Sequence, residues 1–507
     1  GQNGANRFGT NEYTESVRRN KLADMYLAYN HLFGKLNVDA TAGYSYQSFN
    51  AESRSTGNVL NPDLPANFPE VNTDTPYVLI GFFGRTNLSW NDKYLLTLSY
   101  RRDGSSHFAD ENRWGNFPAA SFAWKINEDV FKDNRTISDL KLRVGYGITG
   151  QQNVPNDLYF STVTTGDGVS QYYIGSALTT VAIPNRLSPP ADLKWEETTT
   201  YNVGLDYGFF NNRLTGAIDF FYKQSDDLLV DAAVADGTNF SNRAYQNVGS
   251  FTTRGIEFSV NAQIVKAENF NWNVNFNATT YRRKIDELIY NADIFTGGNV
   301  GGTGTPGQIL SEGYAPFSYY VYKQLYDTDG NPLESAFADL NGDGIQNADD
   351  KYIYKNPDPD VTFGFASTMN IAKRVDFSFN LRASLGNSVY NGVNAAQAQL
   401  ATIRQTSDAL YNLPTSVTST NFNTTADVLL SDYYIEDASF LRMDNITVGY
   451  TFPKFVSENS SVRLSAGVQN AFIITDYSGL DPEITGGLDK TIYPRSRTWL
   501  FGVNFKF

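Results

Sequence analysis

The last ten residues, 498–507, constrain the fold most, because their apolar side chains alternate with small or polar ones. Trp499, Phe501, Val503, Phe505 and Phe507 occupy every second position. In an extended strand such positions share one face. Soluble sheets rarely leave an edge strand this apolar, whereas a strand of about ten residues with one apolar and one polar face crosses a bilayer within a closed barrel. The segment therefore predicts a transmembrane β-strand.

The same alternation recurs along the chain. Residues 270–280 are a clear example, because Phe270 and Trp272 alternate with Asn271 and Asn273. The pattern predicts an all-β, transmembrane antiparallel β-barrel over residues 22–507. We expect about fifteen strands, at 22–33, 36–49, 78–90, 94–101, 117–126, 140–149, 201–209, 214–222, 256–264, 270–280, 362–371, 375–385, 441–452, 462–474 and 498–507.

Composition agrees with a barrel and excludes other classes. Aromatic residues make up 14% of the chain, with 32 Tyr and 35 Phe, which suits the aromatic girdles of an outer-membrane barrel. The formal net charge of −14 excludes the basic footprint that nucleic acids require. The sequence has no cysteine, so disulfides and thiolate metal sites are also excluded.

The connections between the predicted strands are of two kinds. Short turns lie near residues 34, 91, 211, 267 and 373, and long connections occupy 51–77, 150–198, 224–250, 281–361, 386–440 and 476–495. Outer-membrane barrels carry short periplasmic turns and long external loops, so the first and last strands both run inward. Such an odd count does not close the usual even-stranded barrel. We expect either strands that precede this chain, with residues 1–21 as an external loop remnant, or one miscounted strand near 318–324.

One motif with metal-binding chemistry lies in the predicted external loop 327–361. Set against the twelve-residue EF-hand loop, short oxygen donors recur at alternate positions and Gly344 stands at the sharp turn. Asp350 replaces the usual final Glu and reaches less far. The alternative is an Asp/Asn/Gly-rich turn that needs no ion. The motif predicts a structural Ca²⁺ site formed by Asp339, Asn341, Asp343, the Ile345 carbonyl, Asn347 and Asp350.

Signals for catalysis are weak, and we expect no enzyme activity. His31 and His107 are the two histidines, and neither belongs to a hydrolase or metalloprotease motif. Tyrosine pairs at 172–173 and 319–320 are candidates for stacking on a sugar or partner, with ordinary loop packing as the alternative. The predicted lumenal arginines, Arg85, Arg143 and Arg382, fit a wall of paired charges.

Several short stretches carry a further signal beside the Ca²⁺-like loop. They are 101–106 (RRDGSS), 140–147 (LKLRVGYG), 193–196 (LKWE), 202–206 (NVGLD), 247–249 (NVG), 254–257 (RGIE), 440–442 (FLR), 449–450 (GY), 469–470 (QN) and 481–483 (DPE). Together with the Ca²⁺-like loop, they resemble the C-terminal barrel portion of the SusC/RagA-like TonB-dependent outer-membrane transporters, and the resemblance covers nearly the whole chain. Lys351 and Tyr354 stand where this family resemblance leads us to expect Arg and Gly.

The resemblance implies a 22-stranded barrel in the Gram-negative outer membrane, of which this chain would hold the last fifteen strands. It also implies a SusD-like surface lipoprotein as lid, uptake of oligosaccharides or peptides driven through TonB, and an N-terminal plug that these residues do not contain. The alternatives are a non-transporting barrel that serves as a structural subunit of a larger outer-membrane complex, and a passive porin. The substrate is not encoded by any motif, because specificity depends on loop shape.

Overall fold

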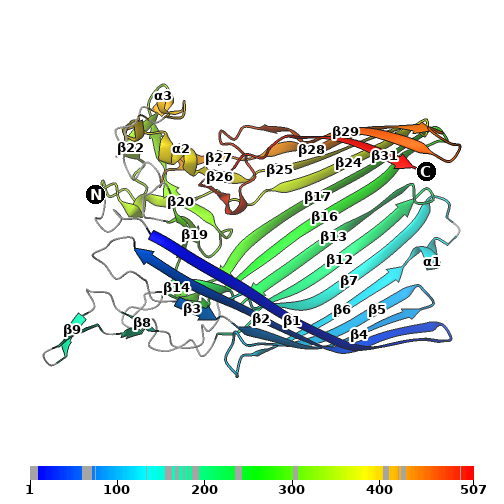
Figure 1. Cartoon of the computed structure of the whole chain (residues 1–507), viewed down its shortest axis with the longest axis horizontal. Helices are drawn as coiled ribbons and strands as arrows, with labels where there is room; N and C mark the ends of the chain where they lie inside the picture. Colours follow the sequence, from blue (N-terminus) through cyan, green and yellow to red (C-terminus); the bar gives the residue numbers. More distant parts are fainter. Residues whose placement is uncertain are drawn as a thin grey trace. The chain divides into compact units, whose positions relative to one another are not determined.

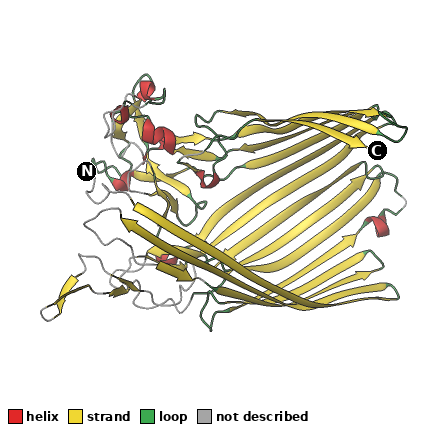
Figure 2. Ribbon diagram, in the orientation of Figure 1, coloured by secondary structure: helices red, strands yellow, loops and turns green. Residues whose placement is uncertain are grey.

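The computed structural model is dominated by one antiparallel sheet whose strands follow one another in chain order (Figures 1 and 2). The structure describes the chain except for residues 1–9, 60–70, 75, 133, 155–162, 166–170, 175–176, 181, 185–192, 234–242, 301–305, 404–409, 411, 421, 424–429 and 491–492. Among the described residues, no helix is both long and apolar enough to span a bilayer.

All fifteen predicted strands are present, so the fold prediction is confirmed. Strand β3 (Val71–Asp74) pairs with β2 outside the main order. The main order is β1 (Thr10–Phe33), β2 (Leu36–Val59), β4 (Tyr77–Trp90), β5 (Tyr94–Ser105), β6 (Trp114–Lys125), β7 (Ile137–Gln151), β12 (Glu196–Phe209), β13 (Leu214–Asp226), β16 (Ser250–Lys266), β17 (Phe270–Glu287), β24 (Val361–Ile371), β25 (Val375–Leu385), β28 (Phe440–Pro453), β29 (Ser461–Thr475) and β31 (Thr498–Lys506).

The beginning of the first strand corrects one expectation. Residues 1–21 were expected to form a loop remnant, but β1 begins at Thr10, and Thr10 pairs with Val59 of β2. The reason is that both strands continue with polar and β-branched residues beyond their apolar stretch, and backbone pairing does not require an apolar face. Hydropathy alternation therefore locates the membrane-facing part of a strand rather than its full length.

Short turns join the strands at one end of the sheet. Gly34 has φ +61° in the turn between β1 and β2, and Asn91 and Asp92 have φ +56° between β4 and β5. Asn and Asp tolerate this left-handed conformation better than other residues with a side chain. The same end holds the connections 126–136, with α1 (Asn127–Val130), and 210–213, 267–269, 372–374 and 454–460.

The long connections carry additional structure. Residues 288–360 contain η2 (Ile289–Asn291), a four-stranded sheet in the order β18-β19-β20-β23, the hairpin β21-β22 and η3 (Ala348–Asp350). Strand β20 explains the suspected extra strand near 318–324, because it exists but lies in this smaller sheet. The bounds are β18 Ile294–Asn299, β19 Pro306–Leu310, β20 Ser318–Tyr322, β21 Gln324–Tyr326, β22 Pro332–Phe337 and β23 Lys351–Tyr354.

Residues 386–439 and 476–497 hold the remaining elements of this region. The parallel pair of β26 and β30 joins these two connections, since Asn391 of β26 pairs with Asp489 of β30. The elements are β26 (Ser388–Asn391), α2 (Gly392–Gln397), η4 (Leu400–Ile403), α3 (Val417–Thr420), η6 (Asp432–Tyr434), β27 (Ile435–Asp437), η7 (Thr485–Gly487) and β30 (Leu488–Asp489). We call connections 288–360, 386–439 and 476–497 together the loop assembly.

The connections 152–195 and 227–249 form short hairpins of their own. Their strands are β8 (Val163–Thr165), β9 (Gln171–Ile174), β10 (Ala177–Thr180), β11 (Ala182–Pro184), β14 (Leu229–Ala233) and β15 (Arg243–Asn247). Near them, Trp195 packs with Phe108 and Phe117 at ring-centroid distances of 5.4 Å and 5.3 Å, in a small buried cluster.

Among the described residues, a large buried core lies in the loop assembly rather than along the main strands. Its centre includes Tyr319, Tyr390 and Tyr434, each at most 2% exposed. Residues from connections 288–360 and 386–439 interleave there, and Leu488 packs against the cluster from the third connection. Burial of these side chains removes apolar area from water, so the loop assembly has its own source of stability.

Candidate functional site

The main strands carry one charged or polar face and one apolar face, as the alternation predicts. On β28, Val448, Tyr450 and Phe452 are 47%, 38% and 41% exposed. On β7, Lys141 and Arg143 occupy the opposite parity to Leu142 and Val144. The exposed apolar rows are the faces expected to contact lipid, and the charged rows are those expected to face the lumen.

The charged face contains ion pairs between neighbouring strands. Arg143 of β7 lies 2.7 Å from Asp206 of β12 and 2.9 Å from Asp219 of β13. Arg382 contacts Asp444 at 2.8 Å, in agreement with the predicted wall of paired charges. Arg85 differs, because it donates a hydrogen bond from Nε to the neutral Asn87 Oδ1 at 3.1 Å.

A dense group of charges lies where β25 and β28 meet the 476–497 connection. Arg382 donates two hydrogen bonds to Glu483, and Nη2 of Arg442 lies 2.6 Å from Asp481 Oδ1. Arg495 lies 2.7 Å from Glu483. The guanidinium groups of Arg382 and Arg442 also lie 5.7 Å and 5.6 Å from the ring centre of Phe440. We call this group of three arginines and three acids, which also includes Asp444, the charge cluster.

The electrostatics of the charge cluster are balanced. Burial raises the pKa of Glu483, but hydrogen bonds from Arg382 and the charges of Arg382, Arg495 and Arg442 outweigh this effect and hold the pKa below its usual range. Each positive charge has an acidic neighbour, so the cluster carries no net charge. It can orient polar groups but supplies neither a proton donor nor a nucleophile at neutral pH.

A cavity of 520 Å³ lies beside the charge cluster and is a candidate small-molecule site. Its wall combines the side of Phe440 with Arg382 and Glu483, and it is completed by polar side chains such as Asn277, Asn387 and Thr485. Apolar surface with a few convergent polar groups is the usual make-up of a small-molecule site. The alternation identified Arg382 as a lumenal residue, but it missed Arg442, Asp481 and Glu483. These three residues lie in the family-like stretches 440–442 and 481–483, and that resemblance was the one sequence feature that could have indicated them.

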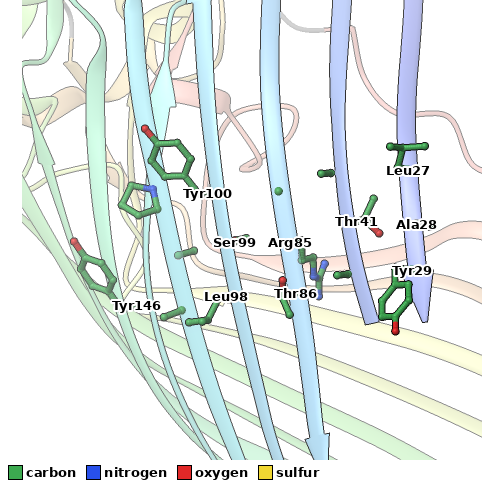
Figure 3. Close-up of a pocket in the computed structure, with 16 residues that line it drawn as sticks. Leu27, Ala28, Tyr29, Thr41, Arg85, Thr86, Leu98, Ser99, Tyr100 and Tyr146 are labelled. Carbon is green, nitrogen blue, oxygen red and sulfur yellow. The ribbon is translucent and has the colours of Figure 1, made fainter. Parts of the chain in front are cut away.

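A larger hollow of 750 Å³ lies along β1, β2, β4, β5, β6 and β7 (Figure 3). Small residues such as Ala40, Ala42 and Gly84 line it, between the larger side chains of Leu98 and Tyr100. Leu98 and Tyr100 are 46% and 50% exposed and alternate with Ser99, so they belong to the apolar face. This hollow is consistent with a surface filled by lipid rather than with a solute site.

The six residues of the predicted Ca²⁺ site lie in one compact loop that ends in η3. Asp339 accepts hydrogen bonds from the backbone N–H groups of Gly342 and Gly344, at 2.6 Å and 2.9 Å. Fully buried Asp350 accepts from Leu340 and Asn347, at 2.9 Å and 3.0 Å. The side-chain oxygens of Asn341, Asp343 and Asn347 likewise accept from the backbone N–H groups of Asp343, Ile345 and Asp349.

The fit of this loop to a metal ion is partial. The donor types are those that Ca²⁺ prefers, and a carboxylate oxygen that accepts one N–H bond retains a lone pair. However, no group of three or more acidic or histidine side chains within the described residues is arranged to hold a metal ion. The backbone hydrogen bonds also match the alternative interpretation of a turn without an ion.

Two of the other candidate residues, His107 and Tyr319, are held by contacts with backbone carbonyl groups of this chain. His107 is 5% exposed, and its Nδ1 lies 3.0 Å from the Gln152 carbonyl oxygen. The Tyr319 hydroxyl lies within 2.8 Å of the carbonyl oxygens of both Ser388 and Gly487, so Tyr319 is a packing residue. Tyr320 is partly exposed beside Phe295. Tyr172 and Tyr173 lie in β9, and their side chains are outside the described part of the structure.

Comparisons with known proteins place this geometry in a family. Residues 1–471 match the family "TonB dependent receptor-like, beta-barrel". The chain is 38% identical over 521 residues to TonB-dependent receptor SusC of Bacteroides thetaiotaomicron, a match covering 99% of this chain and 52% of SusC. It is 31% identical to TonB-dependent receptor P3 of Formosa agariphila, covering 98% of this chain and 53% of that protein.

The fold agrees with solved structures as well. The RagAB peptide transporter matches with a TM-score of 0.79 at 21% identity, over 97% of this chain and 56% of the other. The RagAB peptide importer in its "open-open" state matches with a TM-score of 0.80 at 22% identity, over 98% and 56%. The chain spans about half the length of the curated relatives it matches. The family consists of receptors rather than enzymes, in agreement with the weak catalytic signals. This chain therefore belongs to the TonB-dependent receptor family, as part of an outer-membrane β-barrel of the SusC/RagA-like kind.

Proposed function

We propose that this chain forms the C-terminal barrel wall and outer rim of an energised outer-membrane importer that takes up oligosaccharides or peptides. The observation that carries the proposal is the 38% identity to SusC across 99% of the chain. The similarity to the RagAB peptide transporter supports the fold of an importer barrel. TonB would act through a part of the protein outside these residues.

The loop assembly is the part that would meet solute and partner. It has its own buried core, and it brings the 520 Å³ cavity next to the neutral charge cluster. A wall without net charge suits uncharged or zwitterionic solutes, because it provides hydrogen-bond donors and acceptors without a strong field. A SusD-like lipoprotein would cover this end of the barrel as a lid.

Uptake in cells tests the proposal. A strain lacking the full-length gene would be complemented with it and supplied with oligosaccharides or peptides as the sole carbon source. Energised import predicts growth that requires the gene, a SusD-like lipoprotein and TonB. Growth that survives deletion of TonB would indicate a passive porin, and unchanged growth without the gene would indicate a barrel that does not transport.

We also propose that the loop 339–350 binds one structural Ca²⁺. The bound ion would supply charge that holds the acidic side chains of this loop together. Asp339, Asn341, Asp343, the Ile345 carbonyl, Asn347 and Asp350 would provide the oxygen ligands. The supporting observation is that the side-chain oxygens of Asn341, Asp343 and Asn347 accept hydrogen bonds from backbone N–H groups of the same loop, which holds the loop in a compact turn.

Hydrogen exchange of the full-length protein tests this ion. Ca²⁺ should slow exchange of the amides in residues 339–350 relative to EDTA. Asp343→Asn should raise the Ca²⁺ concentration needed for this slowing at least tenfold. Asp110→Asn is the matched control, because this acid lies in the separate β5–β6 connection. Equal exchange with Ca²⁺ and with EDTA would support a turn that needs no ion.

A further inference from the structure

Three basic side chains lie together near the ends of β16 and β17 that continue into long connections. The two strands are neighbours in the main sheet (Figure 1). Arg254 of β16 pairs directly with Arg282 of β17, and Lys284 lies two positions further along β17. Directly paired residues of an antiparallel ladder, and residues two positions apart on one strand, point to the same face of a sheet. The three cations therefore share one face, and we call them the basic triad.

The face that carries the basic triad is the apolar face of the two strands. Ile256 is the next residue after Arg254 on this face, and it is 48% exposed. Further along the same face, the ring centre of Phe276 lies 6.2 Å from that of Phe258 and 5.9 Å from that of Phe363. Exposed apolar rows of a barrel are expected to contact lipid. The basic triad therefore begins where this row changes from apolar to charged.

The length of β17 places the basic triad at a membrane surface. The strand has 18 residues, whereas a tilted strand needs only about 9–11 residues to cross the hydrocarbon core. Its first residue, Phe270, follows the short turn 267–269, and Arg282 lies toward its other end, which continues into connection 288–360. Short turns are periplasmic and long loops are external in outer-membrane barrels. We therefore expect Arg282 at the height of the lipid headgroups of the outer leaflet.

The direct pairing of two arginines is electrostatically unfavourable. Like charges opposite one another in a ladder repel, because their Cβ atoms are only about 4.5–5.5 Å apart. Asp360 lies 2.5 Å from Arg282, and Asp286 lies 3.2 Å from Lys284. The side chains of Arg282 and Lys284 nevertheless stay 63% and 57% exposed, and Arg254 is exposed as well. The basic triad thus remains accessible to an anion that contacts both arginines.

We propose that the basic triad binds the phosphate group of an outer-leaflet lipid whose acyl chains lie along the apolar row. Guanidinium groups form paired hydrogen bonds with phosphate oxygens, and basic residues beside a membrane attract anionic headgroups. A phosphate between Arg254 and Arg282 also offsets their mutual repulsion. The exposed apolar surface of Ile256 favours a lipid over a free anion, because it contacts acyl chains beside the phosphate. This site does not depend on solute import.

Native mass spectrometry of the purified full-length protein in an uncharged detergent tests the proposal. The probe is monophosphoryl lipid A, compared with the same lipid after removal of its phosphate. The phosphorylated form should bind about tenfold more tightly or better, because charge-assisted hydrogen bonds are lost with the phosphate. An excess of inorganic phosphate should leave this binding unchanged. Equal binding of the two lipids overturns the proposal, and so does displacement by inorganic phosphate, which would indicate a site for a free anion.

Two variants and a control locate the site. Arg254→Gln combined with Arg282→Gln removes both guanidinium groups from exposed positions and should lower the preference for the phosphorylated lipid about tenfold. Asp360→Asn removes the acid that competes for Arg282 and should tighten binding of this lipid, which tests the site even if the first variant fails to fold. The matched control, Lys373→Gln, changes a 68% exposed cation in a short turn at the other end of the sheet and should have no effect. An unchanged preference in both site variants overturns the proposal, as does an equal loss in the control.

Discussion

The ion pair between Arg442 and Asp481 should be the most sensitive point of the charge cluster. The two side chains are only 3% and 5% exposed. Asp481 also accepts a hydrogen bond from the backbone N–H of Glu483 at 3.0 Å and lies 3.4 Å from Arg495. The perturbation is Asp481→Asn, which keeps the size of the side chain and removes its charge. Arg442 is then buried without its main counter-ion.

Removing one partner of a buried ion pair destabilises a protein by about 3–5 kcal/mol. Glu483 lies 3.9 Å from Nε of Arg442 and retains part of the attraction, so we expect the lower end, about 3 kcal/mol. The matched control is Glu268→Gln, which neutralises an acid that is 82% exposed beside Lys373. An exposed pair of this kind contributes about 1 kcal/mol or less.

The assay is urea unfolding of the full-length protein in lipid vesicles, followed by tryptophan fluorescence. The double variant Arg442→Met with Asp481→Leu should recover most of the loss, because replacing a buried pair with apolar residues is often neutral. The reasoning is refuted if Asp481→Asn lowers the free energy of unfolding no more than Glu268→Gln does. If the double variant is as unstable as Asp481→Asn, the lower free energy of unfolding would instead be assigned to packing around Phe440.

Three further changes test the loop assembly. Tyr319→Phe leaves the carbonyl groups of Ser388 and Gly487 without their hydroxyl donor and should destabilise by about 1–3 kcal/mol in the same urea assay. Gly487→Ala should lower the melting temperature more than Gly486→Ala, because both have positive φ but only at Gly487 would a Cβ lie 2.3 Å from the Tyr319 hydroxyl. Backbone hydrogen bonds, led by the one from Asn347, hold the pKa of Asp350 below its usual range despite desolvation. The stability it adds is therefore complete above its unfolded pKa of about 3.9 and disappears as pH falls through the lower folded value. The protection factors of the amides in residues 340–347, which correct hydrogen exchange for its intrinsic pH dependence, should thus fall in acid in the wild type and change little with pH in Asp350→Asn.

Alternation identified all fifteen strands of the main order, but not the short β3, because one face of each of the fifteen must be apolar along the membrane-facing length. It did not locate the ends of β1 and β2, whose outer parts pair through the backbone without an apolar face. The sequence pattern also did not predict the charge cluster. Arg442 and Asp481 are separated by 39 positions. The pairing shift at Asn380/Leu381 alters which residues of β25 and β28 lie opposite one another, and the shift at Met443/Asn445 does the same between β28 and β29.

Aromatic composition shows why part of the structure could not be predicted. The abundance of Tyr and Phe indicated girdles at the membrane surface, and exposed Tyr450 and Phe452 on β28 agree with that interpretation. Yet Tyr319, Tyr390 and Tyr434 are among the largest fully buried side chains, and all three lie in the loop assembly. A tyrosine ring serves both places because it is apolar with one polar end. Its hydroxyl reaches water or headgroups from a strand, whereas in the loop assembly the Tyr319 hydroxyl reaches backbone carbonyls of two other connections. Counting aromatic residues therefore cannot separate membrane anchoring from loop packing, and only the long-range partners of each hydroxyl do so.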